Sequence, residues 1–325
     1  MIFDALQYSY SFLRPYYERT NVHRSVIEEL PDPKLRDAYA VCRRITRSHA
    51  KTFYLATRFL PNEKQRAIFS VYALCRCLDD TVDEAEDLLA KKQISVNDIK
   101  AMVDDWKNKL NRTYHFGVGE NQVLVALADT LTRFKMPIEP ALELAEGVCM
   151  DLTKNRYANF AELYDYSYKV ASTVGLMTSE IFGYESKEAL PYAVDLGIAM
   201  QLTNILRDIG EDLDRDRIYL PQDELEKFGI SEEDLFARKM TYEFARFMEF
   251  QIKRARSYYQ RAEKGIAMLN KDSQLPVWLA RFNYARILDK IEENSFQVFD
   301  QRAYLSTSQK LAILPKALWR IQRAA

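Results

Sequence analysis

Glycine and proline are scarce in this sequence, which has 9 Gly and 10 Pro among 325 residues. Because these two residues punctuate turns, their scarcity argues against a fold of many short strands and favours long helices. The alternating apolar and polar runs that are typical of strands are also absent, as are internal repeats. The composition therefore predicts an all-α protein.

Long apolar runs are missing as well, since none approaches the ~20 residues of a transmembrane helix. The N-terminus MIFDALQYSYSF carries Asp4 and no basic residue before its apolar ones, so we expect no signal peptide. The four cysteines show no second Cys or His pair at zinc-binding spacing, which favours buried, reduced thiols. These features predict a cytoplasmic protein and leave open a peripheral contact with a membrane surface for product release.

The sequence has no excess of positive or negative residues, because 46 Lys and Arg balance 47 Asp and Glu. The net charge of −1 gives no reason to expect nucleic acid as a partner. The 48% of hydrophobic residues suffices for a sizeable core, and no compositional shift marks a domain boundary. We therefore expect a single domain over residues 1–325, with an oligomeric state that the sequence does not give.

Apolar residues recur with the period of a helix along almost the whole chain. The breaks between these segments contain proline or glycine, as at Pro61, Pro137, Gly183 and Pro221. The polar segment 90–100 is expected to be a surface connection. The predicted helices span residues 35–50, 64–84, 97–111, 121–134, 139–155, 161–182, 188–214, 240–268, 275–294 and 306–322.

Acidic residues form a stripe near the end of the helix predicted over residues 64–84. With ~100° of turn per residue, Tyr72, Arg76, Asp79 and Asp83 fall within about 60° of one another. A second stripe lies near the end of the helix predicted over 188–214, where Gln201, Asn204, Asp208 and Asp212 fall within about 80°.

Both stripes are electrostatically unfavourable as they stand. Asp79 and Asp83 are spaced i,i+4, as are Asp208 and Asp212, and such like-charged pairs repel by roughly 0.2–0.5 kcal/mol. Acids near a helix C-terminus also oppose the helix dipole. A solvated helix end would be the simplest explanation for one such stripe, whereas two on apolar helices favour relief by bound cations.

The ligand types indicate which cation would bind. Carboxylates and an amide, with no His or Cys nearby, suit Mg²⁺ or Mn²⁺, and Mg²⁺ commonly takes its remaining ligands from phosphate oxygens. The run Asp212-x-Asp214-x-Asp216 has the opening spacing of an EF-hand, but Arg217 replaces the required glycine. The two stripes therefore predict a magnesium–diphosphate site, with nearby arginines to hold the diphosphate.

Aromatic residues are abundant, with 20 Tyr and 17 Phe. Most aromatic side chains pack protein cores, and a helical protein this rich in them could also line a long apolar cavity.

Several ordered blocks of the chain resemble the squalene/phytoene synthase family of head-to-head prenyl transferases. They are SHAKTFYLATRFLP (48–61), VYALCRCLDDTVDE (71–84), MDLTKNRY (150–157), ELYDYSYKVASTVGLM (162–177) and AMQLTNILRDIGEDLDRDRIYLP (199–221). The block YARILDKIEENSFQVFDQRAYLSTSQKL (284–311) is most similar to the phytoene synthase branch. The resemblance implies an isoprenoid synthase fold, a single-domain helical bundle around a central cavity.

The resemblance also implies roles for individual residues. Asp79, Asp83, Asp208 and Asp212 would be the catalytic aspartates, and together with Asn204 they would bind Mg²⁺. A further group would bind the diphosphates or line the substrate cavity: Lys51, Thr52, Phe53, Arg76, Tyr166, Gln201, Arg217 and Tyr219. Thr52 stands where the family has a small hydroxyl residue, usually Ser.

The activity implied is the joining of two prenyl diphosphates, most similar to formation of phytoene from two geranylgeranyl diphosphates through prephytoene diphosphate, without NADPH. Farnesyl diphosphate as the substrate of a squalene-type or dehydrosqualene-type enzyme remains open, as does a non-catalytic assembly factor with the same fold. The DDTVD run and the Asn204/Asp208/Asp212 spacing also occur in chain-elongating prenyl transferases and terpene cyclases, but the other blocks favour the head-to-head family.

Overall fold

The computed structural model describes residues 21–91 and 93–324, leaving aside the side chains of residues 21–24, 51, 52, 86, 87, 89, 90, 96, 323 and 324. This part of the chain is built from helices, and no strand forms within it, which confirms the predicted all-α class. The helices are α2 (Asn21–Glu28), α3 (Pro33–His49), α4 (Lys51–Thr57), α5 (Asn62–Ala90), α6 (Val96–Phe116), α7 (Gln122–Arg133), α8 (Glu139–Met150), α9 (Phe160–Ser167), the π-helix η1 (Tyr168–Ser172), α10 (Thr173–Phe182), α11 (Ala189–Leu213), α12 (Gln222–Lys227), α13 (Glu232–Phe236), α14 (Tyr242–Ile266), α15 (Lys271–Glu293), α16 (Thr307–Leu311) and α17 (Leu314–Ala324).

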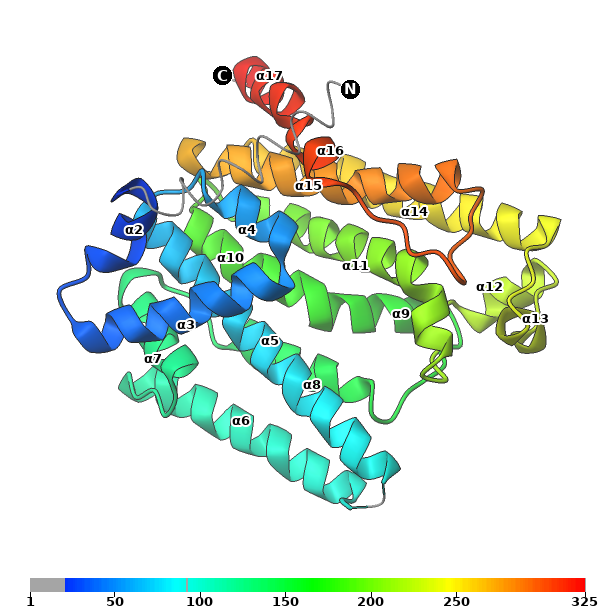
Figure 1. Ribbon diagram of the computed structural model, residues 1–325, viewed down its shortest axis with the longest axis horizontal. Helices are drawn as coiled ribbons and strands as arrows, with labels where there is room; N and C mark the ends of the chain where they lie inside the picture. Colours follow the sequence, from blue (N-terminus) through cyan, green and yellow to red (C-terminus); the bar gives the residue numbers. More distant parts are fainter. Residues whose placement is uncertain (1–20, 92, 325) are drawn as a thin grey trace.

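Helix α11 runs through the middle of the molecule (Figure 1). It contacts α14 and α15 on one side and η1 and α10 on the other. Helix α5 packs against α3, α7, α8 and α10, so it belongs to the neighbouring part of the bundle. The two helices that carry the predicted acidic stripes therefore both pack against α10, and their other main neighbours differ.

Local sequence signals explain where many helices begin and end. Ser95 and Asp98 form a reciprocal capping box at the start of α6, and Gly117 ends that helix with a positive φ of 65°. Asn121 and Thr241 cap α7 and α14 through their side chains. These caps satisfy backbone N–H groups that would otherwise lack partners.

Apolar faces of the helices form the core. The buried face of α5 includes Ile68 and Leu74, while α11 buries Leu202 and Leu206. Because each helix buries one face and turns its polar stripe elsewhere, Asp79 on α5 and Asp208 on α11 are left lining a polar cavity that opens to the surface.

Gly210 allows the α15–α16 connector, residues 294–306, to lie directly on α11. A Cβ atom at Gly210 would stand 1.9 Å from the backbone oxygen of Phe299, so no larger residue fits there without a shift of the backbone. The N–H of Gly210 also donates to the oxygen of Val298 over 3.3 Å. This close approach brings the connector alongside the acidic stripe of α11.

The structure corrects several predicted boundaries. The helix predicted over 161–182 is interrupted by η1, and the helix predicted over 139–155 ends at Met150. The predicted surface connection over 90–100 is shorter, because α6 begins at Val96. The four helices α2, α4, α12 and α13 were missed because five to eight residues give too few turns for a periodic signal.

Two finer predictions also need correction. Helix α5 continues to Ala90, about two turns beyond Asp83, so the opposing helix dipole has little effect on that stripe. Of the four cysteines, which are all free thiols, only Cys42 is fully buried, and the other three are half-buried. Among the described residues, no helix combines the length and the apolarity that a membrane span requires.

Candidate active site

A polar cavity of about 740 Å³ lies between α5, α11 and the ends of α3 and α8. Most of the predicted site residues line it, from elements far apart in the sequence. They are Phe53, Arg76, Asp79, Asp83, Tyr166, Gln201, Asn204, Asp208 and Arg217. The side chains of Lys51 and Thr52 lie outside the described residues, so their predicted roles stay predictions.

The stripe on α5 contains an aspartate with a strongly altered pKa. Burial within the protein raises the pKa of Asp79 to about 7 although its side chain borders the open cavity, and the negative charges of Asp83 and Asp151 add to this effect. Arg76 opposes the shift, but its guanidinium pairs directly with Asp80 and lies 3.9 Å from Asp83. Asp79 is therefore a crowded carboxylate that a cation would stabilise.

The stripe on α11 is neutralised differently. Both oxygens of Asp208 accept hydrogen bonds from Arg207, with N–O distances of 2.7 and 2.5 Å. The same two oxygens accept bonds from Arg302 of the connector, at 2.9 and 3.2 Å. Asn204 makes a weaker contact, donating from Nδ2 to Gln201 over 3.3 Å.

Asp212 lies one turn beyond Asp208 but does not line the large polar cavity. It borders a small neighbouring pocket together with Arg217 and Tyr219. Burial raises the pKa of Asp212 to about 7, and the charge of Asp208 adds to the effect while Arg217 opposes it. Asp79 on α5 and Asp212 on α11 thus both have a pKa that burial and neighbouring aspartates raise.

Asp151 is a third source of carboxylate oxygens that the sequence analysis did not single out. It follows the last residue of α8 and lines the polar cavity. Tyr219 donates to Asp151 over 2.8 Å, and Tyr166 donates to its second oxygen over 3.0 Å. Burial raises the pKa of Tyr166 well above its usual range, so its phenol stays protonated and can act as this donor.

The two tyrosines that hold Asp151 also stack on each other, with ring centroids 5.1 Å apart. This explains why the predicted residues Tyr166 and Tyr219 lie together. Asp151 escaped the sequence analysis because it has no acidic neighbour at helical spacing. Its position inside the block MDLTKNRY was the only available signal.

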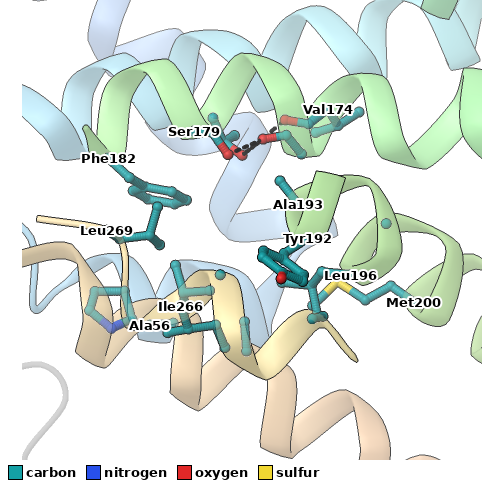
Figure 2. A pocket seen from close by; sticks show the side chains of 18 of the residues that line it. Ala56, Val174, Ser179, Phe182, Tyr192, Ala193, Leu196, Met200, Ile266 and Leu269 are labelled. Atoms are coloured by element: carbon teal, nitrogen blue, oxygen red, sulfur yellow. Dashed lines mark hydrogen bonds between the residues drawn. The ribbon is translucent and has the colours of Figure 1, made fainter. Parts of the chain in front are cut away.

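An apolar cavity of about 140 Å³ (Figure 2) shares a lining residue with the polar one. It is lined by α4, α10, α11, α14 and α15, and small or apolar side chains such as Ala193, Leu196 and Phe182 face it. Phe53 lines both cavities, and its ring lies 6.0 Å from that of Tyr72. The pair of cavities can hold a molecule with an anionic head and an apolar tail.

The donor atoms fit a divalent cation that is shared with a bound anion. Carboxylates from α5 and α11 line one cavity, and two aspartates have pKa values raised by burial and by neighbouring negative charge. Among the described residues, no three acids, histidines or cysteines converge as a ready-made metal centre. The arrangement therefore suits a divalent cation that takes part of its coordination from the oxygens of a bound anion.

The structure is an all-α bundle in which acidic helices surround a polar cavity that adjoins an apolar one. Its solved structural neighbours include a dehydrosqualene synthase, which places the fold in the class of all-α isoprenoid synthases. The squalene/phytoene synthase family model matches residues 46–309, so the chain belongs to this family.

Two curated relatives and one solved structure illustrate the similarity. The chain is 44% identical to the 15-cis-phytoene synthase of Synechococcus elongatus over 298 residues, which cover 88% of this chain and 94% of the relative. It is 40% identical to the 15-cis-phytoene synthase of Synechocystis over 318 residues, or 92% of each chain. A crystal structure of a dehydrosqualene synthase with a ligand superposes with a TM-score of 0.81 at 26% identity, covering 89% of this chain and 98% of that one.

Proposed function

We propose that this protein condenses two molecules of geranylgeranyl diphosphate head to head, through prephytoene diphosphate, and releases phytoene for carotenoid biosynthesis. The observation that carries the proposal is the junction at Phe53, where a cavity rich in acids and arginines adjoins an apolar one. Curated relatives of nearly the same length are phytoene synthases, which favours the C20 substrate.

The predicted metal ligands are Asp79, Asp83, Asn204, Asp208 and Asp212. Mg²⁺, or Mn²⁺ in its place, would supply positive charge that makes a diphosphate a better leaving group. The side chains of Arg76 and Arg207 line the same cavity and would orient the diphosphate oxygens by charge-assisted hydrogen bonds.

The remaining residues would guide the reaction of the carbon chain. Phe53 lines both cavities and Tyr72 lines the polar one beside it, and their aromatic faces would stabilise a developing allyl cation. The apolar walls beyond them exclude water that would otherwise trap the cation as an alcohol. The double bond of the second substrate then attacks the cation, and loss of a proton closes the cyclopropane ring of prephytoene diphosphate. Departure of the second diphosphate and rearrangement of the new cation take place in the same enclosure. Proton loss completes phytoene without a reductant.

The dehydrosqualene synthase similarity keeps farnesyl diphosphate as the alternative substrate. The acidic residues at all four predicted aspartate positions argue against a non-catalytic assembly factor, which has no need of them. A peripheral contact with a membrane would help an apolar C40 product to leave, and it stays a prediction.

Product analysis tests the proposal. The purified protein is incubated with Mg²⁺ and either geranylgeranyl or farnesyl diphosphate, with and without NADPH. We expect a C40 hydrocarbon from the C20 substrate without NADPH. A C30 hydrocarbon as the main product would instead assign the protein to the squalene-type branch. The absence of any condensation product under all of these conditions would contradict the assignment as an enzyme.

A further inference from the structure

A second cleft, of about 630 Å³, lies beside the polar cavity, and we call it the cationic cleft. Its walls are one stripe of α15, the α15–α16 connector and α16. Arg286 and Lys290 face it at i,i+4 spacing on α15, and Arg302 completes a group of three cations. Among the described residues that line it there is no Asp or Glu.

Arg286 has an unusual environment for a half-buried cation. Its Nη1 donates to the backbone oxygen of Gln309 over 3.2 Å. This contact uses one of the five N–H donors of the guanidinium. Within the described part of the chain, no carboxylate lies at ion-pair distance from it. Lys290 pairs with Glu293, one turn along the same helix at 3.1 Å. Because no carboxylate lines the cleft, an anion that binds here would gain charge-assisted hydrogen bonds from Arg286 and Lys290.

Arg302 connects the cationic cleft with the polar cavity, because it lines both. In the structure its guanidinium is directed to Asp208 and lies 3.4 Å from Glu211. An anion that leaves the aspartate cavity past Arg302 would next meet Lys290 and Arg286 without passing a lining carboxylate.

We propose that the cationic cleft is a second, metal-independent binding site for a diphosphate group. The choice of diphosphate among anions rests on the proposed function, in which each turnover releases two diphosphates that must leave the aspartate cavity. Guanidinium and ammonium groups bind phosphate oxygens through strong charge-assisted hydrogen bonds. Inorganic diphosphate on its way out and the head group of an incoming prenyl diphosphate share this chemistry.

The binding of inorganic diphosphate to the full-length protein in EDTA tests the proposal, measured by isothermal titration calorimetry. We expect the wild type to bind without metal, and the Arg286→Gln/Lys290→Gln double variant to bind about tenfold more weakly or worse. The Lys253→Gln/Lys264→Gln double variant on the exposed side of α14 also removes two positive charges, outside the cleft, and should match the wild type. Circular dichroism shows whether each variant is folded.

Equal affinity of the wild type and the double variant, or no binding by the wild type in EDTA, would overturn the proposal. A parallel titration with geranylgeranyl diphosphate distinguishes the two sources of the group. Loss of affinity for inorganic diphosphate alone identifies an exit site, and loss for both ligands identifies an entry site as well. Because these titrations need no turnover, they succeed or fail independently of the product analysis that tests the proposed function.

Discussion

Arg302 and Asp208 form a two-point ion pair across 94 positions of the chain, with N–O distances of 2.9 and 3.2 Å. Since Arg207 binds the same two oxygens, the predicted metal ligand Asp208 is already neutralised by two guanidinium groups. A metal ion must therefore compete with arginine for this carboxylate.

Removing Arg302 should strengthen metal binding in the absence of substrate. We expect Arg302→Gln to raise the affinity for Mn²⁺ about threefold to fivefold, which corresponds to loss of a half-exposed ion pair. The measurement is a Mn²⁺ titration followed by electron paramagnetic resonance.

Arg261→Gln provides the matched control, because Arg261 makes a similar two-point pair with Asp195, at 3.0 Å to each oxygen, and neither residue lines the polar cavity. An equal gain of affinity in both variants would show a general effect of charge, and an unchanged affinity in Arg302→Gln would contradict competition at Asp208.

The aspartates that line the polar cavity should be needed for turnover and dispensable for folding. We expect Asp79→Asn and Asp208→Asn each to lower kcat by a factor on the order of 10²–10³, because each removes a predicted ligand of the Mg²⁺ whose charge would stabilise the leaving diphosphate. Steady-state assays and thermal unfolding of the same preparations measure the two properties.

Asp216→Asn is the control for these variants. Asp216 has a positive φ of 55°, which asparagine also tolerates, and it pairs with Arg156 over 2.8 Å outside the polar cavity. It should keep nearly full activity. Full activity in Asp79→Asn or Asp208→Asn instead would refute the metal–diphosphate site.

The altered pKa values of Asp79 and Asp212 predict how the stability of the metal-free protein depends on pH. Both groups titrate near pH 7 in the folded protein and near pH 4 when unfolded, so the folded state holds more protons between these values. The contribution of these groups to stability therefore falls as the pH rises from about 4 to about 7.

Thermal unfolding in EDTA at pH 5 and pH 8 measures this effect. We expect Asp79→Asn to raise the melting temperature at pH 8 by on the order of 2 °C and to change it little at pH 5. Added Mg²⁺ should reduce the difference at pH 8. A variant that is equally stabilised at both pH values would show that the charge of Asp79 isn't the cause.

The sequence allowed part of the site to be predicted because helical spacing is a local property. Asp79 and Asp208 each belong to a stripe that one helix defines, and both line the polar cavity. Arg302 could not be found in this way, because only the close approach of the connector to Gly210 brings it to Asp208.

Asp212 and Asp151 show in two ways that helical spacing alone does not define the site. Asp212 shares the predicted stripe, yet the packing at the end of α11 places it in a separate pocket beside Tyr219. Asp151 belongs to no stripe, yet tertiary contacts with Tyr166 and Tyr219 place it in the cavity. Spacing identified the acidic surface of a helix, whereas the contacts between helices decided which acids share a cavity.

The volume of the apolar cavity should determine the length of prenyl chain that the protein accepts. Ala193 on α11 faces this cavity beside Tyr192 and Val174 (Figure 2), so Ala193→Phe would fill space that a long tail needs. We expect kcat/KM for geranylgeranyl diphosphate to fall at least about tenfold, since crowding by several carbon atoms costs more than the ~1–3 kcal/mol of one methylene. The shorter farnesyl diphosphate should lose less, so the ratio of the two kcat/KM values shifts toward the C15 substrate. Ala237→Phe, at an exposed position after α13, adds the same ring away from the cavity and should leave that ratio unchanged. If Ala193→Phe lowered kcat/KM equally for both substrates, this part of the cavity wall would not select substrates by chain length.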